Sequence, residues 1–279
     1  MSQKYTQFLR KYIRLAFASY YIHVLGLLTA FAGPPAEFGY YSLVFSDEFD
    51  GLDLGFSEDG PASRPHNWYE GVWFSKHHAP PRNFVTGNST LSLIWTRGQQ
   101  QPDSSIATFS RRNSHYHAWR YGYFEVRMKW QPEQGAWPAV WLIPVQAAAD
   151  GPHESGEIDI FEGQGSQPRT FFATIHHWYG SHDLENSSLR NHFPLPPETD
   201  FREFHTYGLL WVPGRMTWYF DGLPLHSEPT FEIFDKQDYY LILSMQEGSN
   251  WKEGDLTGVS AQRLSLSVDW VRVWQPRSH

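Results

Sequence analysis

The chain has 279 residues, of which 41% are hydrophobic and 19% are charged, a composition typical of a globular protein with a sizeable core. It contains no cysteine, which excludes a disulfide framework, a thiolate zinc site, an iron–sulfur cluster and a cysteine nucleophile. The formal net charge is −8, from 22 basic and 30 acidic residues, and four of the cations lie before residue 15. Without those four, 18 cations face 30 acids, a charge of −12 that disfavours nucleic acid as a partner.

The N-terminal segment has the pattern of an export signal. The mostly apolar run 15–32 follows the four cations Lys4, Arg10, Lys11 and Arg14. It ends in Ala30-Phe31-Ala32, the small-x-small pattern that signal peptidases accept, before Gly33. We therefore expect a signal peptide over 1–32, cleaved after Ala32, and a secreted or periplasmic protein. An uncleaved membrane anchor is the alternative, because such a run nearly spans a bilayer. The rest of the sequence contains no second apolar run of that length, so we expect no membrane contact once the signal is cleaved.

The remaining residues, 33–279, are expected to form a single all-β domain. Short aromatic and β-branched runs alternate with turn residues, and no long 3.6-residue periodicity is present. Strands are predicted over 204–212 and 215–220, with a further turn at Asp221-Gly222. Alternation over 264–270 predicts a half-buried strand, whose phase then shifts to Val271 and Val273. This pattern indicates a sandwich or barrel.

Three carboxylates lie within six residues of one apolar strand, Gly156-Glu157-Ile158-Asp159-Ile160-Phe161-Glu162-Gly163. Alternation places Glu157 and Asp159 on one face but would send Glu162 into the core with the isoleucines. A β-bulge at Ile160-Phe161 adds one residue and returns Glu162 to the face of the other two acids. We therefore predict a bulge at this point.

The predicted spacing suits glycoside hydrolysis. Four strand positions separate the Cα atoms of Glu157 and Glu162 by about 13 Å, and side chains that lean together would shorten this to about 6 Å. Retaining glycosidases hold their two carboxyl groups roughly 5–5.5 Å apart, one as the nucleophile and one as the acid/base. Asp159 lies between them and can separate their proton affinities. A calcium site or a solvated strand face is the alternative interpretation of three close acids.

These residues resemble glycoside hydrolase family 16, whose signature is Glu-x-Asp-x-x-Glu in its bulged form. Further similar segments follow in the family's order: SDEFDG at 46–51, YGYFEVRMKW at 121–130, GAWPAVWLIP at 135–144, FHTYGLLW at 204–211 and VDWVRVW at 268–274. The resemblance implies a β-jelly roll of two curved antiparallel sheets, with Glu157 as nucleophile, Asp159 as assisting acid and Glu162 as acid/base. The bulged form is similar to the laminarinase, agarase and carrageenase branches.

Several aromatic and histidine residues are candidates for binding sugar. Trp137 and Trp141 lie four positions apart, so both face one way in a regular strand, and they are expected to stack on sugar rings; core packing is the alternative. Trp251 is similar to an aromatic at the edge of the family's cleft. Of the neighbours His176 and His177, only one can face the cleft, where it would form hydrogen bonds.

One residue is a candidate ligand for a structural metal ion. Asp269 resembles a structural calcium site of the family, with backbone oxygens near Glu48 or Gly87. No cofactor is expected to be required for catalysis.

We therefore expect a monomeric, secreted, endo-acting β-glycanase with retaining chemistry that hydrolyses β-1,3-glucan of the laminarin type. A neutral polymer suits the acidic body. The alternatives are a galactan hydrolase of the agarase or carrageenase kind, a transglycosylase, or a glucan-recognition module without catalysis. Intact Glu157 and Glu162 argue against the last, because a binding module needs no crowded acids.

Overall fold

A computed structural model gives the fold of the body. The described residues belong to one compact unit, Gly33–His279, and cover 33–35, 39–55, 65–70, 80–98, 104–111, 116–148, 153–184, 191–249, 252–253 and 257–277. The predicted signal peptide over 1–32 and Trp251 lie outside these ranges, so both expectations stay predictions. Within the ranges, no helix combines the length and apolar character needed to cross a membrane.

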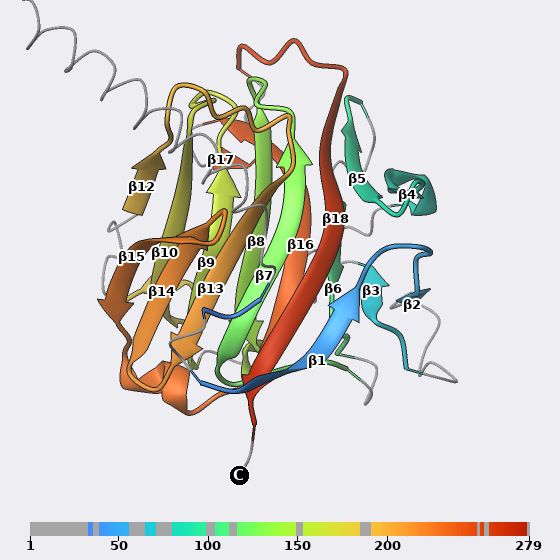
Figure 1. The fold of residues 1–279 in the computed structure, drawn as a ribbon. Helices are drawn as coiled ribbons and strands as arrows, with labels where there is room; N and C mark the ends of the chain where they lie inside the picture. The colour runs from blue at the N-terminus through green and yellow to red at the C-terminus, as the bar shows by residue number, and fades with distance from the viewer. Residues whose placement is uncertain are drawn as a thin grey trace, which may run out of the picture. The chain divides into compact units, whose positions relative to one another are not determined.

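The first of two sheets has eight described strands in the order β15-β14-β13-β7-β18-β5-β4, with β1 also paired to β18 (Figure 1). Its strands are β1 (Tyr41–Asp47), β4 (Phe84–Thr86), β5 (Leu91–Thr96), β7 (Gly122–Trp130), β13 (His205–Val212), β14 (Arg215–Phe220), β15 (Leu223–Pro229) and β18 (Arg263–Pro276). The long β18 pairs with β5 along its first half and with β1 along its second half.

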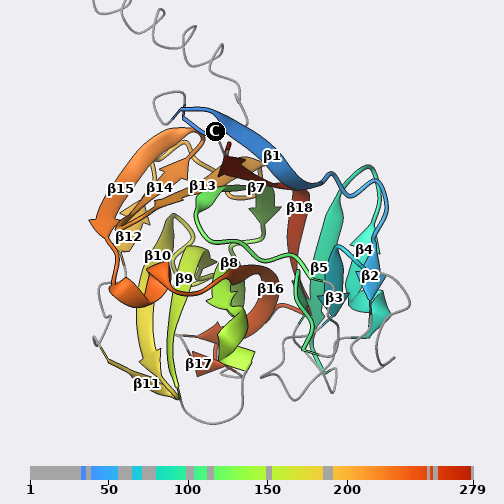
Figure 2. The ribbon, with the colours of Figure 1, turned by 90° about the horizontal axis from the view of Figure 1, so that it is seen from below.

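The second sheet has ten described strands in the order β11-β10-β9-β8-β16-β6-β3-β2, with β12 on β10 and β17 on β16. They are β2 (Leu54–Gly55), β3 (Trp68–Glu70), β6 (Ser104–Ala107), β8 (Ala136–Pro144), β9 (Glu154–Gly163), β10 (Thr170–Tyr179), β11 (His182–Asp183), β12 (Asn191–Pro194), β16 (Tyr239–Ser249) and β17 (Lys252–Glu253). Short 3-10 helices are η3 (Pro81–Asn83), η4 (Val145–Ala148) and η5 (Glu232–Asp235). The two sheets form two layers, as Figure 2 shows from below.

The main core fills the space between the sheets and draws on both. Its largest fully buried side chains are aromatic, and they come from strands of each layer: Trp68, Trp95, Trp130, Trp211 and Trp218. Alternate residues of each strand point into this core, so the period-two pattern of the sequence is the pattern of a sandwich. The predicted all-β jelly roll is confirmed.

The predicted strands over 204–212 and 215–220 and the turn after them are present, and the turns have the required backbone. β13 and β14 are joined through Gly214, whose φ is +74°. Asp221 and Gly222 then have φ values of 47° and 75°, the left-handed pair that a two-residue hairpin needs before β15. Glycine and aspartate tolerate this region, which is why the turn could be recognised.

The phase shift in β18 has a physical cause. The register of β18 against β7 slips between Val268 and Trp270, so Asp269 is an extra, bulged residue. Val271 and Val273 then continue the core face. Trp270 is buried but is not part of the main core cluster, and the Arg272 guanidinium lies 4.2 Å from its ring centroid.

Candidate active site

The predicted bulge in β9 is present. Against β8, Phe161 pairs with Val140 and Asp159 with Trp141, so Ile160 has no partner of its own. The register against β10 shifts at the same point. Ile160 and Phe161 both belong to the main core, although they are consecutive residues. The extra residue therefore restores the phase, and Glu162 avoids the core.

The three acids project from the face of the second sheet that is turned away from the main core, here called the acidic face. Beside them on this face, a second apolar cluster includes Ala139 and Trp141 of β8. Ala139 pairs with Glu162 and Trp141 pairs with Asp159 across the β8–β9 ladder. Residues paired in this way share a face of the sheet. Glu157, Asp159 and Glu162 therefore line one surface.

Glu157 is partly buried and has one strong hydrogen-bond donor. The indole Nε1 of Trp178 donates to Glu157 Oε2 at 2.8 Å. Burial, followed by the negative charge of Asp159, raises the pKa of Glu157, which is about 7 with all its neighbours present. The positive charge of His176 and the Trp178 bond act in the other direction. Glu157 is thus poised to titrate close to neutral pH.

His176 lies between two carboxylates. Its Nε2 lies 3.2 Å from Asp159 Oδ2, and its Nδ1 lies 3.3 Å from Asp183 Oδ2 at the short edge strand β11. Burial, the largest influence, lowers the pKa of His176, but hydrogen bonding and charge from Asp159, with help from Glu157 and Asp183, raise it to about 10. The ring also stacks on Trp178, with centroids 5.1 Å apart. The imidazolium therefore carries its charge among the acids at neutral pH.

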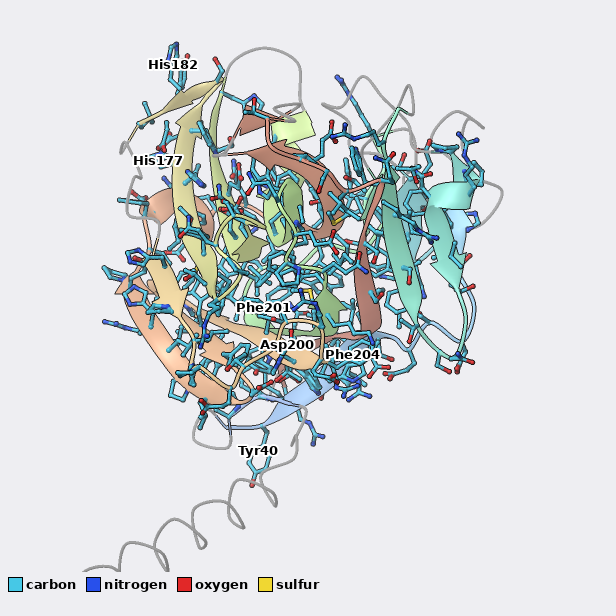
Figure 3. The ribbon with its side chains drawn as sticks, turned by 90° about the horizontal axis from the view of Figure 1, so that it is seen from above. Tyr40, His177, His182, Asp200, Phe201 and Phe204 are labelled. Carbon is cyan, nitrogen blue, oxygen red and sulfur yellow. The ribbon has the colours of Figure 1, made fainter. Side chains whose placement is uncertain are left out.

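His177 has a different environment, which settles which neighbour faces the acids. Its Nε2 lies 2.7 Å from Glu154 Oε1, and its ring stacks on Phe231 with centroids 5.3 Å apart. Figure 3 shows His177 on β10, below His182 at the same end of the sheet. Of the two candidates, His176 reaches the acidic face.

The two tryptophans of β8 share the acidic face, as their spacing predicts. Trp137 is partly exposed and donates its indole Nε1 to Glu162 Oε1 at 3.1 Å. Trp141 is only 9% exposed, and its Nε1 donates to Ser244 Oγ at 3.3 Å. Trp137 thus has an open surface and a polar link to Glu162, whereas Trp141 is mostly packed.

Comparison with known proteins now bears on this arrangement. The sequence model of glycosyl hydrolases family 16 matches residues 75–272, more than half of the chain. The chain belongs to this family.

Relatives of this family-16 chain include two bacterial enzymes. It is 37% identical over 265 residues to the endo-1,3-1,4-beta-glycanase EglC of Rhizobium meliloti, covering 82% of this chain and 51% of that protein. It is 27% identical over 259 residues to a beta-glucanase of Rhodothermus marinus, covering 85% of this chain and 86% of that protein. The chain therefore spans about half the length of EglC.

The fold of the family-16 chain matches a solved laminarinase catalytic domain from Thermotoga maritima with a TM-score of 0.67. That domain is 22% identical to this chain, and the match covers 86% of this chain and all of the domain. Because the identity is low, this likeness supports the jelly-roll fold alone.

One group of described residues in the family-16 chain has spacing that a metal ion could use. Ligand atoms of Glu157, Asp159 and His176 lie within 4.8 Å of one another. The carboxylates already have partners in the protein: His176 pairs with Asp159, and the Trp178 indole donates to Glu157. An imidazolium in the centre of the cluster is a poor neighbour for a cation.

The predicted calcium ligand has a basic neighbour. Asp269 Oδ2 forms an ion pair with Arg127 Nη1. The nearby Glu48 is held by Arg272 through two bonds of 2.8 Å. This arrangement does not fit a calcium ligand, since a guanidinium already neutralises the carboxylate, and calcium binding by Asp269 stays an untested prediction.

Sequence reasoning missed three residues of the site. Trp178 donates to Glu157, Asp183 holds His176, and Ser244 accepts from Trp141. Trp178 is two positions from His176 in one strand, so alternation alone could have placed it on the acidic face. Asp183 and Ser244 lie on other strands, and no local pattern marks them.

Proposed function

We propose that this family-16 chain is an endo-acting β-glucanase that cleaves its substrate with retention of configuration. The observation that carries the proposal is the bulge in β9, which brings Glu157, Asp159 and Glu162 onto one face with an indole donor at each glutamate. A double displacement requires two carboxyl groups, one as the nucleophile and one as the acid/base.

In the proposed first step, the Glu157 carboxylate attacks the anomeric carbon while Glu162 gives its proton to the departing glycosidic oxygen. The bond from the anomeric carbon to that oxygen breaks as the bond to Glu157 forms, leaving a covalent glycosyl-enzyme. Water then attacks the same carbon, Glu162 takes its proton, and Glu157 leaves as a carboxylate. Two inversions restore the original configuration.

The neighbours of Glu157 support its role as nucleophile, which must be ionised to attack. The Trp178 N–H and the charge of His176 both favour the carboxylate form of Glu157. Asp159 holds His176 in its charged state. In this proposal Asp159 acts through His176 as well as directly on Glu157.

We propose β-1,3-linked glucan, alone or mixed with β-1,4 linkages, as the substrate class. The relatives named for 1,3-1,4-glycanase and glucanase activity support this choice. So does the acidic body, because a neutral polymer meets no charge repulsion there. Export as a monomer without a catalytic cofactor completes the proposal.

One panel of polysaccharides tests the proposal. The protein is incubated with laminarin, mixed-linkage β-glucan, agarose and carrageenan, and products are sized over time. We expect internal cleavage of the glucans, and NMR of the first reducing ends should show β-anomers. Initial α-anomers would refute the double displacement. Cleavage of agarose or carrageenan alone would refute only the substrate, and binding of glucan without cleavage would indicate a recognition module.

A further inference from the structure

A buried acid far from the catalytic face has a partner at the start of the compact unit. Glu125, on β7 of the first sheet, is only 2% exposed. This burial is the main reason why its pKa is raised to about 7. The backbone N–H of Gly33 donates to Glu125 Oε2 at 3.0 Å, and the Tyr123 hydroxyl donates to Oε1 at 3.0 Å. Gly33 follows Ala32, where the sequence predicts signal cleavage.

We propose that Glu125 and Tyr123 form a receiving site for a free α-ammonium group at Gly33, created by hydrolysis of the Ala32–Gly33 bond. The hydrolysis consumes one water and leaves a carboxylate on Ala32 and an ammonium on Gly33. The nitrogen that already faces Glu125 thereby changes from a neutral amide to a cation. This inference rests on the predicted processing and not on the proposed glucanase activity.

Among the described residues, no cation forms an ion pair with Glu125, and its surroundings explain why. Arg272 lies opposite Glu125 in the β7–β18 ladder, but its guanidinium is engaged by both oxygens of Glu48. On the other side, β13 places Gly208 opposite Glu125, where a Cβ would lie 2.5 Å from the Tyr123 hydroxyl oxygen. The absence of a side chain at Gly208 makes room for Tyr123 to cover the carboxylate.

The other charged groups near Glu125 do not compensate the charge of its carboxylate. Asp221, in the β14–β15 turn, raises the pKa of Glu125, whereas Arg272 lowers it from a distance. Two further rings pack against Tyr123, those of Tyr219 and Trp274, each with its centroid 5.7 Å away. With all these groups present, burial still leaves the carboxylate undercompensated. An ammonium at 3.0 Å would supply the missing charge, since a charge-assisted bond is stronger than one from a neutral amide.

The pH dependence of stability should therefore differ before and after cleavage. In the uncleaved chain the folded pKa of Glu125 lies above its unfolded value, so its contribution destabilises the fold as pH rises from 4.5 through about 7. In the cleaved chain the ammonium lowers the pKa of Glu125 and removes this loss. An α-amino group has an ordinary pKa of about 7.7–8.0, and the ion pair should raise it. The stability gained is present between the lowered pKa of Glu125 and the raised pKa of the amine, and it is lost as pH falls through the first or rises through the second.

The test compares two forms of the protein, one exported and processed and one that retains residues 1–32 because it is produced without export. N-terminal sequencing of the exported form should find Gly33, and any other first residue would overturn the proposal. At pH 7.5 we expect Glu125→Gln to lower the melting temperature of the processed form by about 2–4 °C. In the uncleaved form the same change should leave the melting temperature equal or higher, because it removes a buried charge.

Glu232→Gln is the matched control, because Glu232 pairs with Lys236 on an exposed surface. It should shift both forms equally. Equal shifts from Glu125→Gln in both forms would also refute the ion pair. If the Glu125 variant does not fold, the pKa of the unmodified Gly33 amine in the wild-type processed form decides, measured by NMR from the Gly33 Cα shift in protein labelled with ¹³C-glycine. A value above the ordinary range supports the proposal, and a value within or below it overturns it.

Discussion

His176 Nε2 lies 3.2 Å from Asp159 Oδ2, and this ion pair joins β9 to β10 in the middle of the acidic face. The charge on His176 favours the ionised form of Glu157, which burial and Asp159 oppose. The protonation of the proposed nucleophile is therefore a balance among three neighbouring side chains. That balance can be shifted by mutation and observed as a change in pH dependence.

We predict that the acid limb of kcat/KM has an apparent pKa near 7, since the proposed mechanism requires ionised Glu157, whose pKa is raised to about 7. Activity should fall as pH drops below that value. His176→Gln removes the positive charge that lowers the pKa of Glu157, so the limb should move to higher pH. His177→Gln is the control, because His177 contacts Glu154 instead. A limb that stays in place in His176→Gln would contradict this account.

The catalytic pair itself is tested by amide substitutions. Glu157→Gln and Glu162→Gln should each lower turnover on polymer by about 10²–10⁴-fold or more, because each removes a group that must exchange a proton or form a bond. Folding should be retained, since the amide keeps the shape of the side chain and can still accept the indole N–H. Asp159→Asn should have a smaller effect. Wild-type turnover in either folded glutamine variant would show that the pair is wrongly assigned.

The roles of the two glutamates can be separated with an activated aryl glycoside, whose leaving group needs no protonation. Glu162→Gln should recover much of its glycosylation rate on this substrate, and added azide should replace water and yield a glycosyl azide. Glu157→Gln should show no such recovery of the glycosylation step. The products are identified by mass spectrometry and NMR. Recovery at position 157 in place of 162 would reverse the two roles.

Local sequence patterns predicted the features that depend on neighbouring residues. The acids of β9 revealed the bulge because strict alternation would have sent Glu162 into the main core between the sheets. Asp221-Gly222 revealed a hairpin because few residues tolerate its backbone. Trp137 and Trp141 were correctly placed on one face because residues four positions apart in a regular strand point to the same side.

Contacts between distant strands could not be predicted in this way. The bond from Trp137 to Glu162 depends on the β8–β9 register, and the contact of Asp183 with His176 depends on how the chain returns at β11. The bulge at Asp269, which shifts the phase of β18 before Trp270, depends on the register against β7. In each case the deciding interaction crosses strands, and a single sequence carries no direct signal for it.

The two tryptophans of β8 should respond differently to truncation, because only Trp137 has a partly exposed ring. Trp137→Ala should weaken glucan binding by about 1–3 kcal/mol through loss of stacking, with little change in melting temperature. Trp141 is mostly buried in the second apolar cluster, so Trp141→Ala should cost about 3–5 kcal/mol of stability. Calorimetric binding to a glucan oligosaccharide and thermal melting, measured on both variants, separate the two effects.

Trp137→Phe completes this test, because phenylalanine keeps a flat ring but cannot donate to Glu162. We expect binding close to that of the wild type and a lower kcat, since the indole Nε1 lies 3.1 Å from Oε1 of Glu162, the proposed acid/base. Trp218→Phe is the comparison from the main core, where the lost indole N–H bonds the backbone carbonyl of Asp159 and the expected change is in stability. If Trp137→Ala melts far below the wild type and binds glucan normally once folded, Trp137 is a packing residue and not a sugar platform.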